Sequence, residues 1–307
     1  MARPSEAAPL AGVDVGGSAL KLGVLARDGS GRVARTLAVR KGDSAEFLLE
    51  SAARTLLELA RGPLQGAGVG LPGLLDRGAG RVHKSPNLPW LEDVPVGEVL
   101  ARHLGLPSSA IRLENDANVA ALGEQWLGAA RGERDLLLLT LGTGIGGGLI
   151  LGGELFVGAG MAGEVGHLNL DPDGPPCGCG ARGCLEQFAS ASAARRRALE
   201  RGLPADAPGN LERLAELARE RSGPERELFH AVGYDLGRGL AQVLALLDLR
   251  TFVFGGGFSA ALDVLEPGIR HALGVWVYGE RASQVRLLRA SLGSNAGWIG
   301  AARLALG

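Results

Sequence analysis

The sequence lacks any apolar run near the roughly 20 residues that a membrane-spanning helix requires. It also lacks net charge, because 32 basic side chains are balanced by 33 acidic ones. Such a balance creates no long-range field that would gather nucleic acid or an anionic membrane. Residues 1–10 contain no apolar segment of the signal-peptide kind, so we interpret them as a short leader on a cytoplasmic protein.

Cysteine is scarce, and its three copies all fall within residues 177–184. Disulfides are rare in the cytoplasm, so this tight cluster indicates a metal site, with free reduced thiols as the alternative. Three thiolates need a fourth ligand to close a tetrahedral zinc site, and His167 lies ten residues upstream. We therefore predict a structural zinc knuckle over residues 167–184, with these ligands: His167, Cys177, Cys179 and Cys184. The zinc would orient two flanking carboxylates, Glu164 and Glu186, into one pocket.

Glycine is abundant, with 50 residues, and it gathers after apolar runs. Strand-like segments on either side of Gly16-Gly17 predict a β-glycine-β hairpin. A second hairpin of the same plan surrounds Gly142–Gly148, and this recurrence predicts an internal duplication of two α/β halves. Between the hairpins, Ser44 as N-cap and the apolar spacing of residues 47–57 predict an amphipathic helix. No long linker separates the halves, so we place the boundary near residues 115–118.

The second glycine cluster matches G-x-G-x-x-G over residues 142–147, but the chain continues there as a strand. A dinucleotide fold would start a helix at that point, and the sequence also has no P-loop motif. Two matching turns, each with a small hydroxyl residue, instead suit backbone N–H groups that bind phosphates; simple tight turns are the alternative. The candidate phosphate-binding residues are Gly16, Gly17, Ser18, Thr143 and Gly144.

Two charged residues accompany the first glycine turn. Asp14 precedes the glycines and could hold Mg²⁺ beside the phosphates, or could form an Asx-turn. Lys21, one of only three lysines, could face a phosphate or simply the solvent.

An acid–amide segment, Glu114-Asn115-Asp116-Ala117-Asn118, follows a short predicted strand. Asn115 or Asp116 could act as the N-cap of the helix that follows. Asp116 could also accept a proton from, or orient, a hydroxyl nucleophile, as phosphoryl transfer requires. The two roles are compatible because sites of α/β folds lie at strand ends.

Together these motifs resemble the ROK family, which groups sugar kinases with sugar-responsive repressors. The resemblance covers residues 14 to about 257 and includes D-V-G-G-S, L-P-G, S-P-N-L, E-N-D-A-N, G-T-G, G-E-V-G-H and the C-x-C-G-x-x-G-C-L-E run. The one departure is Ser18, where the family often has threonine.

The resemblance implies an actin-like ATPase (ribonuclease H-like) α/β fold, with two domains and a nucleotide and sugar cleft between them. We expect residues 1–117 to form the first domain, joined by a C-terminal helix over 294–307, and residues 118–293 to form the second. Asp116 would be the catalytic base. The sugar-binding residues implied are Asn87, Asn115, Glu164, His167 and Glu186, and the run against the adenosine is Gly255, Gly256 and Gly257.

The resemblance therefore predicts an ATP- and Mg²⁺-dependent kinase for the 6-hydroxyl of glucose, in a homodimer or homotetramer. Fructose, mannose, allose and N-acetylated amino sugars remain alternative substrates, and polyphosphate remains an alternative donor. A repressor would carry a DNA-binding module ahead of the first hairpin, and only thirteen residues precede Asp14. We therefore expect no nucleic-acid partner.

Overall fold

The computed structural model describes residues 8–85, 88–207 and 209–306. The chain folds into two compact units. The first contains the chain up to Gly132, Val157–Gly160 and the chain from Ser291 onward, and the second contains Glu133–Phe156 and Met161–Ala290. The helix after the acid–amide segment thus groups with the first unit, whereas the sequence placed the division at 117/118. Within the described residues, no helix is both long and apolar enough to cross a membrane.

The first unit is built on a five-stranded sheet. Its strands, in spatial order, are β3 (Val33–Ala38), β2 (Ala19–Leu25), β1 (Leu10–Val15), β4 (Gly66–Leu71) and β7 (Ile111–Asn115). Its helices are α1 (Ala45–Ala60), α2 (Val96–Leu104), α3 (Asp116–Leu127) and α9 (Ala296–Leu304), and a separate hairpin consists of β5 (Leu74–Asp76) and β6 (Arg81–Lys84). Strands β1, β4 and β7 are parallel, while β2 and β3 complete an antiparallel meander.

The second unit repeats this plan. Its sheet has the order β10 (Glu154–Leu155), β9 (Ile145–Leu151), β8 (Leu136–Leu141), β11 (Thr251–Gly255) and β12 (Arg286–Arg289). Its helices are α4 (Glu186–Ala189), α5 (Ala191–Glu200), α6 (Asn210–Glu220), α7 (Pro224–Leu247) and α8 (Leu262–Trp276). In both sheets the first strand pairs antiparallel with the second and parallel with the strand that arrives after a helical crossover. The predicted actin-like α/β fold is thereby confirmed.

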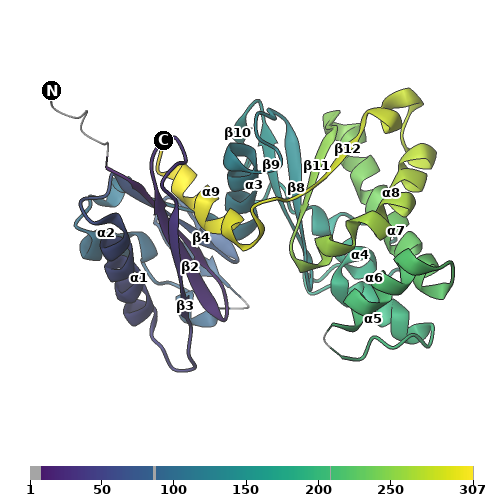
Figure 1. Cartoon of the computed structure of the whole chain (residues 1–307), viewed down its shortest axis with the longest axis horizontal. Helices are drawn as coiled ribbons and strands as arrows, with labels where there is room; N and C mark the ends of the chain where they lie inside the picture. Colours follow the sequence, from purple (N-terminus) through teal and green to yellow (C-terminus); the bar gives the residue numbers. More distant parts are fainter. Residues whose placement is uncertain (1–7, 86–87, 208, 307) are drawn as a thin grey trace. The chain divides into compact units, whose positions relative to one another are not determined.

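Period-2 alternation along β1 and β4 sends different residues to the two faces of the first sheet. Val13 and Val69 face the core that α1 and α2 cover. Gly12 and Gly68 face α9, which lies on the other side of the sheet (Figure 1). A Cβ on Gly12 would lie 1.8 Å from the Trp298 carbonyl oxygen, so α9 approaches the strands backbone to backbone.

Helix α3 approaches α9 equally closely. A Cβ on Gly300 would lie 1.6 Å from the Val119 carbonyl oxygen, and one on Gly123 would lie 2.3 Å from that of Ala296. We call this set the glycine seat: Gly12, Gly68, Gly123 and Gly300. It seats α9 and fixes α3, the helix that begins at Asp116, against the sheet.

Buried Glu124 on α3 secures the segment that leads into α9. Its carboxylate accepts the backbone N–H groups of Ala129 (2.8 Å), Ser291 (3.1 Å) and Leu292 (2.8 Å). A carboxylate can be buried without a large cost in free energy when hydrogen-bond donors pair with its oxygens in this way. Glu124 therefore joins the end of α3 to the point where the chain re-enters the first unit.

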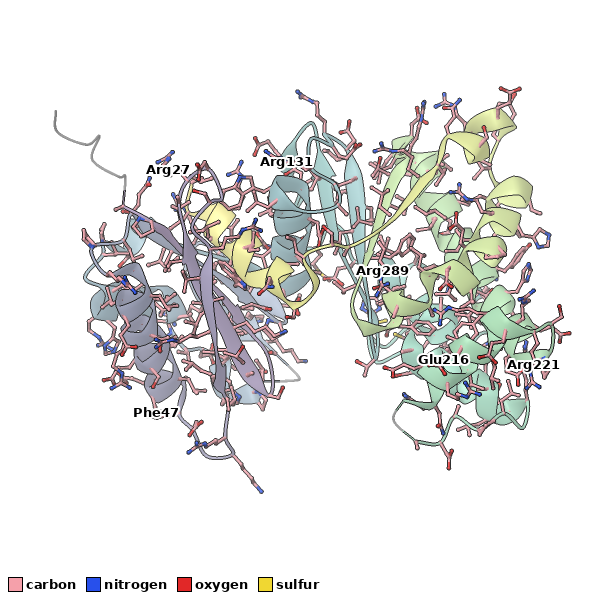
Figure 2. All side chains as sticks on the ribbon, in the orientation of Figure 1. Arg27, Phe47, Arg131, Glu216, Arg221 and Arg289 are labelled. Carbon is pink, nitrogen blue, oxygen red and sulfur yellow. The ribbon has the colours of Figure 1, made fainter. Side chains whose placement is uncertain are left out.

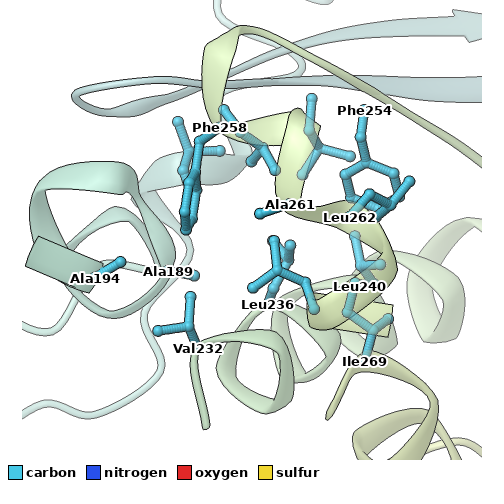
Figure 3. Packing of buried hydrophobic residues seen from close by; sticks show 14 of the residues in the cluster. Ala189, Ala194, Val232, Leu236, Leu240, Phe254, Phe258, Ala261, Leu262 and Ile269 are labelled. Atoms are coloured by element: carbon cyan, nitrogen blue, oxygen red, sulfur yellow. The ribbon is translucent and has the colours of Figure 1, made fainter. Parts of the chain in front are cut away.

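The core of the second unit lies among α7, α8 and the sheet (Figure 3). Phe254 on β11 and Phe258 just beyond it pack with Leu236 and Leu240 of α7 and with Ile269 of α8. This packing anchors the chain on both sides of Gly255–Gly257.

Candidate functional site

The acid–amide segment lies at the carboxyl end of β7, which runs parallel to β4. Asn115 is the N-cap of α3, and its Oδ1 accepts the backbone N–H of Ala117 at 2.9 Å. The predicted cap is confirmed and belongs to Asn115. Asp116 is the first residue of α3, and its side chain is exposed.

Asp14 lies near the end of β1 in the same unit, and its cross-strand partner on β2 is Lys21. Burial is the main cause that raises the pKa of Asp14 to about 6, and the Asp116 carboxylate raises it further. Lys21 acts in the opposite direction and lowers it. The first unit thus brings Asp116 within electrostatic range of Asp14 and Lys21, although Asp116 lies far along the sequence from the hairpin that carries the other two.

The two glycine turns occupy equivalent places in the two sheets. In the first, Gly16 donates its N–H to the carbonyl of Ala19 at 3.0 Å between β1 and β2. In the second, Gly142 donates to the carbonyl of Gly144 at 3.0 Å between β8 and β9. Gly17 and Ser18 in the first turn are exposed, as is Thr143 in the second. Both turns therefore present backbone and hydroxyl groups to solvent, as a phosphate-binding role would require.

The four predicted metal ligands converge in the second unit. One donor atom from each of His167, Cys177, Cys179 and Cys184 lies within 4.8 Å of all the others. The Cys179 and Cys184 sulfurs are 3.6 Å apart, and His167 Nδ1 is 3.7 Å from the Cys177 sulfur. Burial raises the pKa of the Cys177 thiol to about 12, so a thiolate at this position needs a cation beside it. The cluster is a candidate metal site with a three-thiolate, one-imidazole donor set, which is the set of closed zinc sites.

The two carboxylates that flank the cluster lie on short helical segments. Glu164 precedes the turn Val165–His167, and Glu186 begins α4. Glu186 Oε1 lies 3.0 Å from the Cys177 sulfur, and a Cβ on Gly144 would lie 2.7 Å from Glu186 Oε2. The second unit therefore brings the Thr143–Gly144 turn, Glu186 and the cysteine cluster into direct proximity.

A cavity of about 240 Å³ lies beside the third glycine run in the second unit. Gly257 and Phe258 line one side, and α5 and α6 line the other, including Glu216, which is labelled in Figure 2. The full lining is Ala191, Arg195, Gly209, Leu211, Glu212, Ala215, Glu216, Arg219, Gly257, Phe258, Ala260 and Ala261. None of the site residues predicted from the sequence lies between residues 189 and 223, on the α5–α6 side of the cavity. Helix α6 is amphipathic, and an amphipathic pattern cannot distinguish a cavity wall from a core contact.

The predicted site residues therefore fall into two groups, one in each unit. The first unit carries Asp14, Gly16, Gly17, Ser18, Lys21, Asn115 and Asp116. The second carries Thr143, Gly144, Glu164, His167, Glu186, Gly255, Gly256 and Gly257. Asn87 lies outside the described residues.

Comparison with known proteins identifies the family to which the chain belongs. The family model described as "ROK family" matches residues 10–307. The chain therefore belongs to the ROK family, as its motifs predicted.

Individual relatives match over nearly the whole chain. A protein named glucokinase from Thermotoga maritima is 35% identical over 312 residues, covering 96% of each chain. A protein named N-acetylmannosamine kinase from Escherichia fergusonii is 32% identical over 302 residues, covering 96% of this chain and 97% of its own. Among solved structures, a ROK family glucokinase from Streptomyces griseus in complex with glucose and AMPPNP superposes with a TM-score of 0.76. It is 32% identical, and the match covers 96% of this chain and 98% of that one.

Proposed function

We propose that this protein is a glucokinase, an ATP-dependent kinase that transfers the γ-phosphoryl group to the 6-hydroxyl of glucose. The observation that carries the proposal is the acid–amide segment at the end of β7. There an exposed carboxylate, Asp116, follows a residue whose side chain is held as a helix cap. Full-length similarity to glucokinases, including one whose structure holds glucose and an ATP analogue, supports the same conclusion.

In this proposal Asp116 accepts the proton of the sugar hydroxyl as that oxygen attacks the γ-phosphorus of ATP. Phosphoryl transfer depends mainly on positioning and on neutralising charge, so one such carboxylate and well-placed N–H donors suffice. The residues that would contact the sugar are Asn87, Asn115, Glu164, His167 and Glu186.

The nucleotide would be held by backbone groups. The turns at Gly16–Ser18 and Thr143–Gly144 would bind its phosphates, with Lys21 adding positive charge. The cavity beside Gly255–Gly257 would take the adenosine. Asp14 would hold Mg²⁺, which neutralises phosphate charge when bound.

The cysteine cluster would hold one structural zinc ion. Three thiolates and one imidazole fill the four positions of a tetrahedral site, so the ion would have no open position for substrate. Its contribution would be to fix the backbone on both sides of His167 and Glu186. The other ring nitrogen of His167 would then be free to donate to a sugar hydroxyl.

N-acetylmannosamine is the second candidate substrate, because a relative of nearly equal identity carries that activity in its name. The test is an ADP-coupled rate assay with glucose, mannose, fructose, allose, N-acetylglucosamine and N-acetylmannosamine. We expect glucose to give the highest kcat/KM, with ATP preferred to polyphosphate as donor. A higher value with another sugar would replace glucose, and the absence of ADP release with every sugar would refute the kinase assignment.

A further inference from the structure

The β5–β6 hairpin emerges directly from the L-P-G motif and forms a sheet of its own beside the main sheet. Gly73 starts it with φ +104°, and a Cβ there would lie 2.2 Å from the Lys84 carbonyl oxygen. Glycine is therefore required where the two ends of the hairpin meet. Ser85, which follows β6, is fully buried. The hairpin is therefore anchored at both of its ends, by Gly73 and by the buried Ser85.

A single side chain in the hairpin turn reaches the strand that carries the acid–amide segment. Arg77 Nε donates to Glu114 Oε2 at 2.7 Å, and Arg77 Nη2 donates to Glu114 Oε1. This is the paired geometry in which arginine and a carboxylate bind most strongly. Glu114 is only 6% exposed, and Arg77 is 27% exposed. The hydrogen bond to Glu114 also raises the pKa of Arg77, so the guanidinium remains charged.

Glu114 in turn fixes the residues on both sides of Asp116. Its Oε1 accepts the backbone N–H of Asn115 at 2.7 Å and the side-chain amide of Asn118 at 2.9 Å. The Asn115 side chain also reaches back to the Gly73 carbonyl at 3.5 Å. The end of β7, the first turn of α3 and the turn of the hairpin therefore meet at one buried carboxylate.

A buried carboxylate is held in place by its charged partner. Without that partner it must find water, take up a proton or move, because an uncompensated charge in the interior is costly. Movement of the carboxylate would shift Asn115 and Asp116, because Glu114 Oε1 holds the backbone N–H of Asn115. A displacement of about 1 Å in a catalytic group can cost about 100-fold in rate.

We propose that the Arg77–Glu114 ion pair is a positioning device for phosphoryl transfer, which locks the β5–β6 hairpin and the junction of β7 with α3 at Asp116 into one rigid body. The inference rests on the proposed kinase function. Arg77 acts through Glu114 and does not itself contact the reacting atoms in this scheme.

The test compares the wild-type protein with Arg77→Met, Arg77→Lys and the double variant Arg77→Met/Glu114→Gln. We expect Arg77→Met to lower kcat about 100-fold and to raise the KM for glucose, with the KM for ATP unchanged. Lysine keeps the charge but lacks the paired donors, so Arg77→Lys should recover only part of kcat. The double variant removes the stranded charge, so thermal stability should recover while kcat stays low.

Arg286→Met provides the matched control. Arg286 pairs with Glu133 and donates to Thr251 at 3.0 Å, at the starts of β12 and β11, at the opposite end of β11 from the predicted site residue Gly255. We expect this variant to lose stability but to keep both kcat and KM. The positioning role is overturned if Arg77→Met behaves like the control, if its KM for ATP rises as much as that for glucose, or if the double variant recovers kcat together with stability. A wild-type protein that phosphorylates no sugar would overturn the kinase assignment and this inference together, whereas an active wild type with an unaffected Arg77→Met would overturn only the inference.

Discussion

Asp14 is a carboxylate held where its charge is unfavourable, and the substitution Asp14→Asn removes that charge while keeping the shape of the side chain. Burial and the nearby Asp116 carboxylate raise its pKa from 3.8 to about 6. At about 1.4 kcal/mol for each factor of ten in proton affinity, the ionised form is less stable in the folded state than in the unfolded chain by about 3 kcal/mol. Asp14→Asn should therefore stabilise the fold by up to this amount.

The gain depends on pH in a defined direction. Because the pKa of Asp14 is higher in the folded state, its protonated form adds stability that is fully present below pH 3.8 and is lost as the pH rises through about 6. The wild-type protein thus carries the full penalty at pH 8 and roughly half of it at pH 5. The advantage of Asp14→Asn should shrink by the same fraction between these two values.

Urea unfolding of the wild type and the variant at pH 8 and pH 5 measures this difference. Asp28→Asn is a control with the same change of charge, since the hydrogen bond from Ser30 lowers the pKa of Asp28 and the substitution should not stabilise the fold. A gain that is equal at both pH values, or absent at pH 8, would show that the charge of Asp14 does not destabilise the fold. In the coupled assay Asp14→Asn should lose most of its turnover with Mg²⁺ and ATP. The variant would then be more stable and less active than the wild type, as is common for substitutions at functional sites.

Three further predictions address other parts of the molecule. Asp116→Asn should lower kcat by at least about 100-fold while calorimetry shows unchanged glucose affinity; turnover near wild type would exclude Asp116 as the base. Metal analysis should find about one zinc per chain, and Cys184→Ser should lose both the metal and thermal stability; a metal-free wild type would contradict the zinc assignment. Gly300→Ala should destabilise the fold by about 2 kcal/mol or more, because its Cβ would lie 1.6 Å from the Val119 carbonyl. Gly274→Ala, on α8 with open space around its Cβ, should instead gain about 0.5 kcal/mol, and similar losses in both would argue against the glycine seat.

Local sequence patterns predicted much of the first and second sheets. The hairpin expected on either side of Gly16-Gly17 is β1–β2, and the cap expected at Ser44 accepts the Phe47 N–H at 3.2 Å. The repeat of the glycine hairpin predicted the duplication that the two sheet orders display. These features depend on residues close together in the chain, so the sequence records them directly.

The features that the sequence did not reveal join distant residues. Arg77 and Glu114 are 37 positions apart, and nothing near either residue identifies the other as its partner. Glu124 and Ser291 are 167 positions apart. The glycine seat was not predicted for the same reason. A glycine inside a strand or helix normally lowers the stability of that element, and only the position of the opposing backbone shows why glycine is needed there. Single-sequence reasoning proposed candidate site residues but could not reveal the contacts that hold them in place.

The glycine seat also has a consequence for how the chain is made. Helix α9 reaches the ribosome exit only after the whole second unit has been synthesised, yet it covers the glycine face of β1 and β4. Until then the first sheet has one face without its cover, although its strands and α1 emerged much earlier. Domains usually fold in the order of their synthesis. Here the second unit can complete its fold before the first. Until α9 is synthesised, the first unit remains incompletely folded and accessible to chaperones and to other chains.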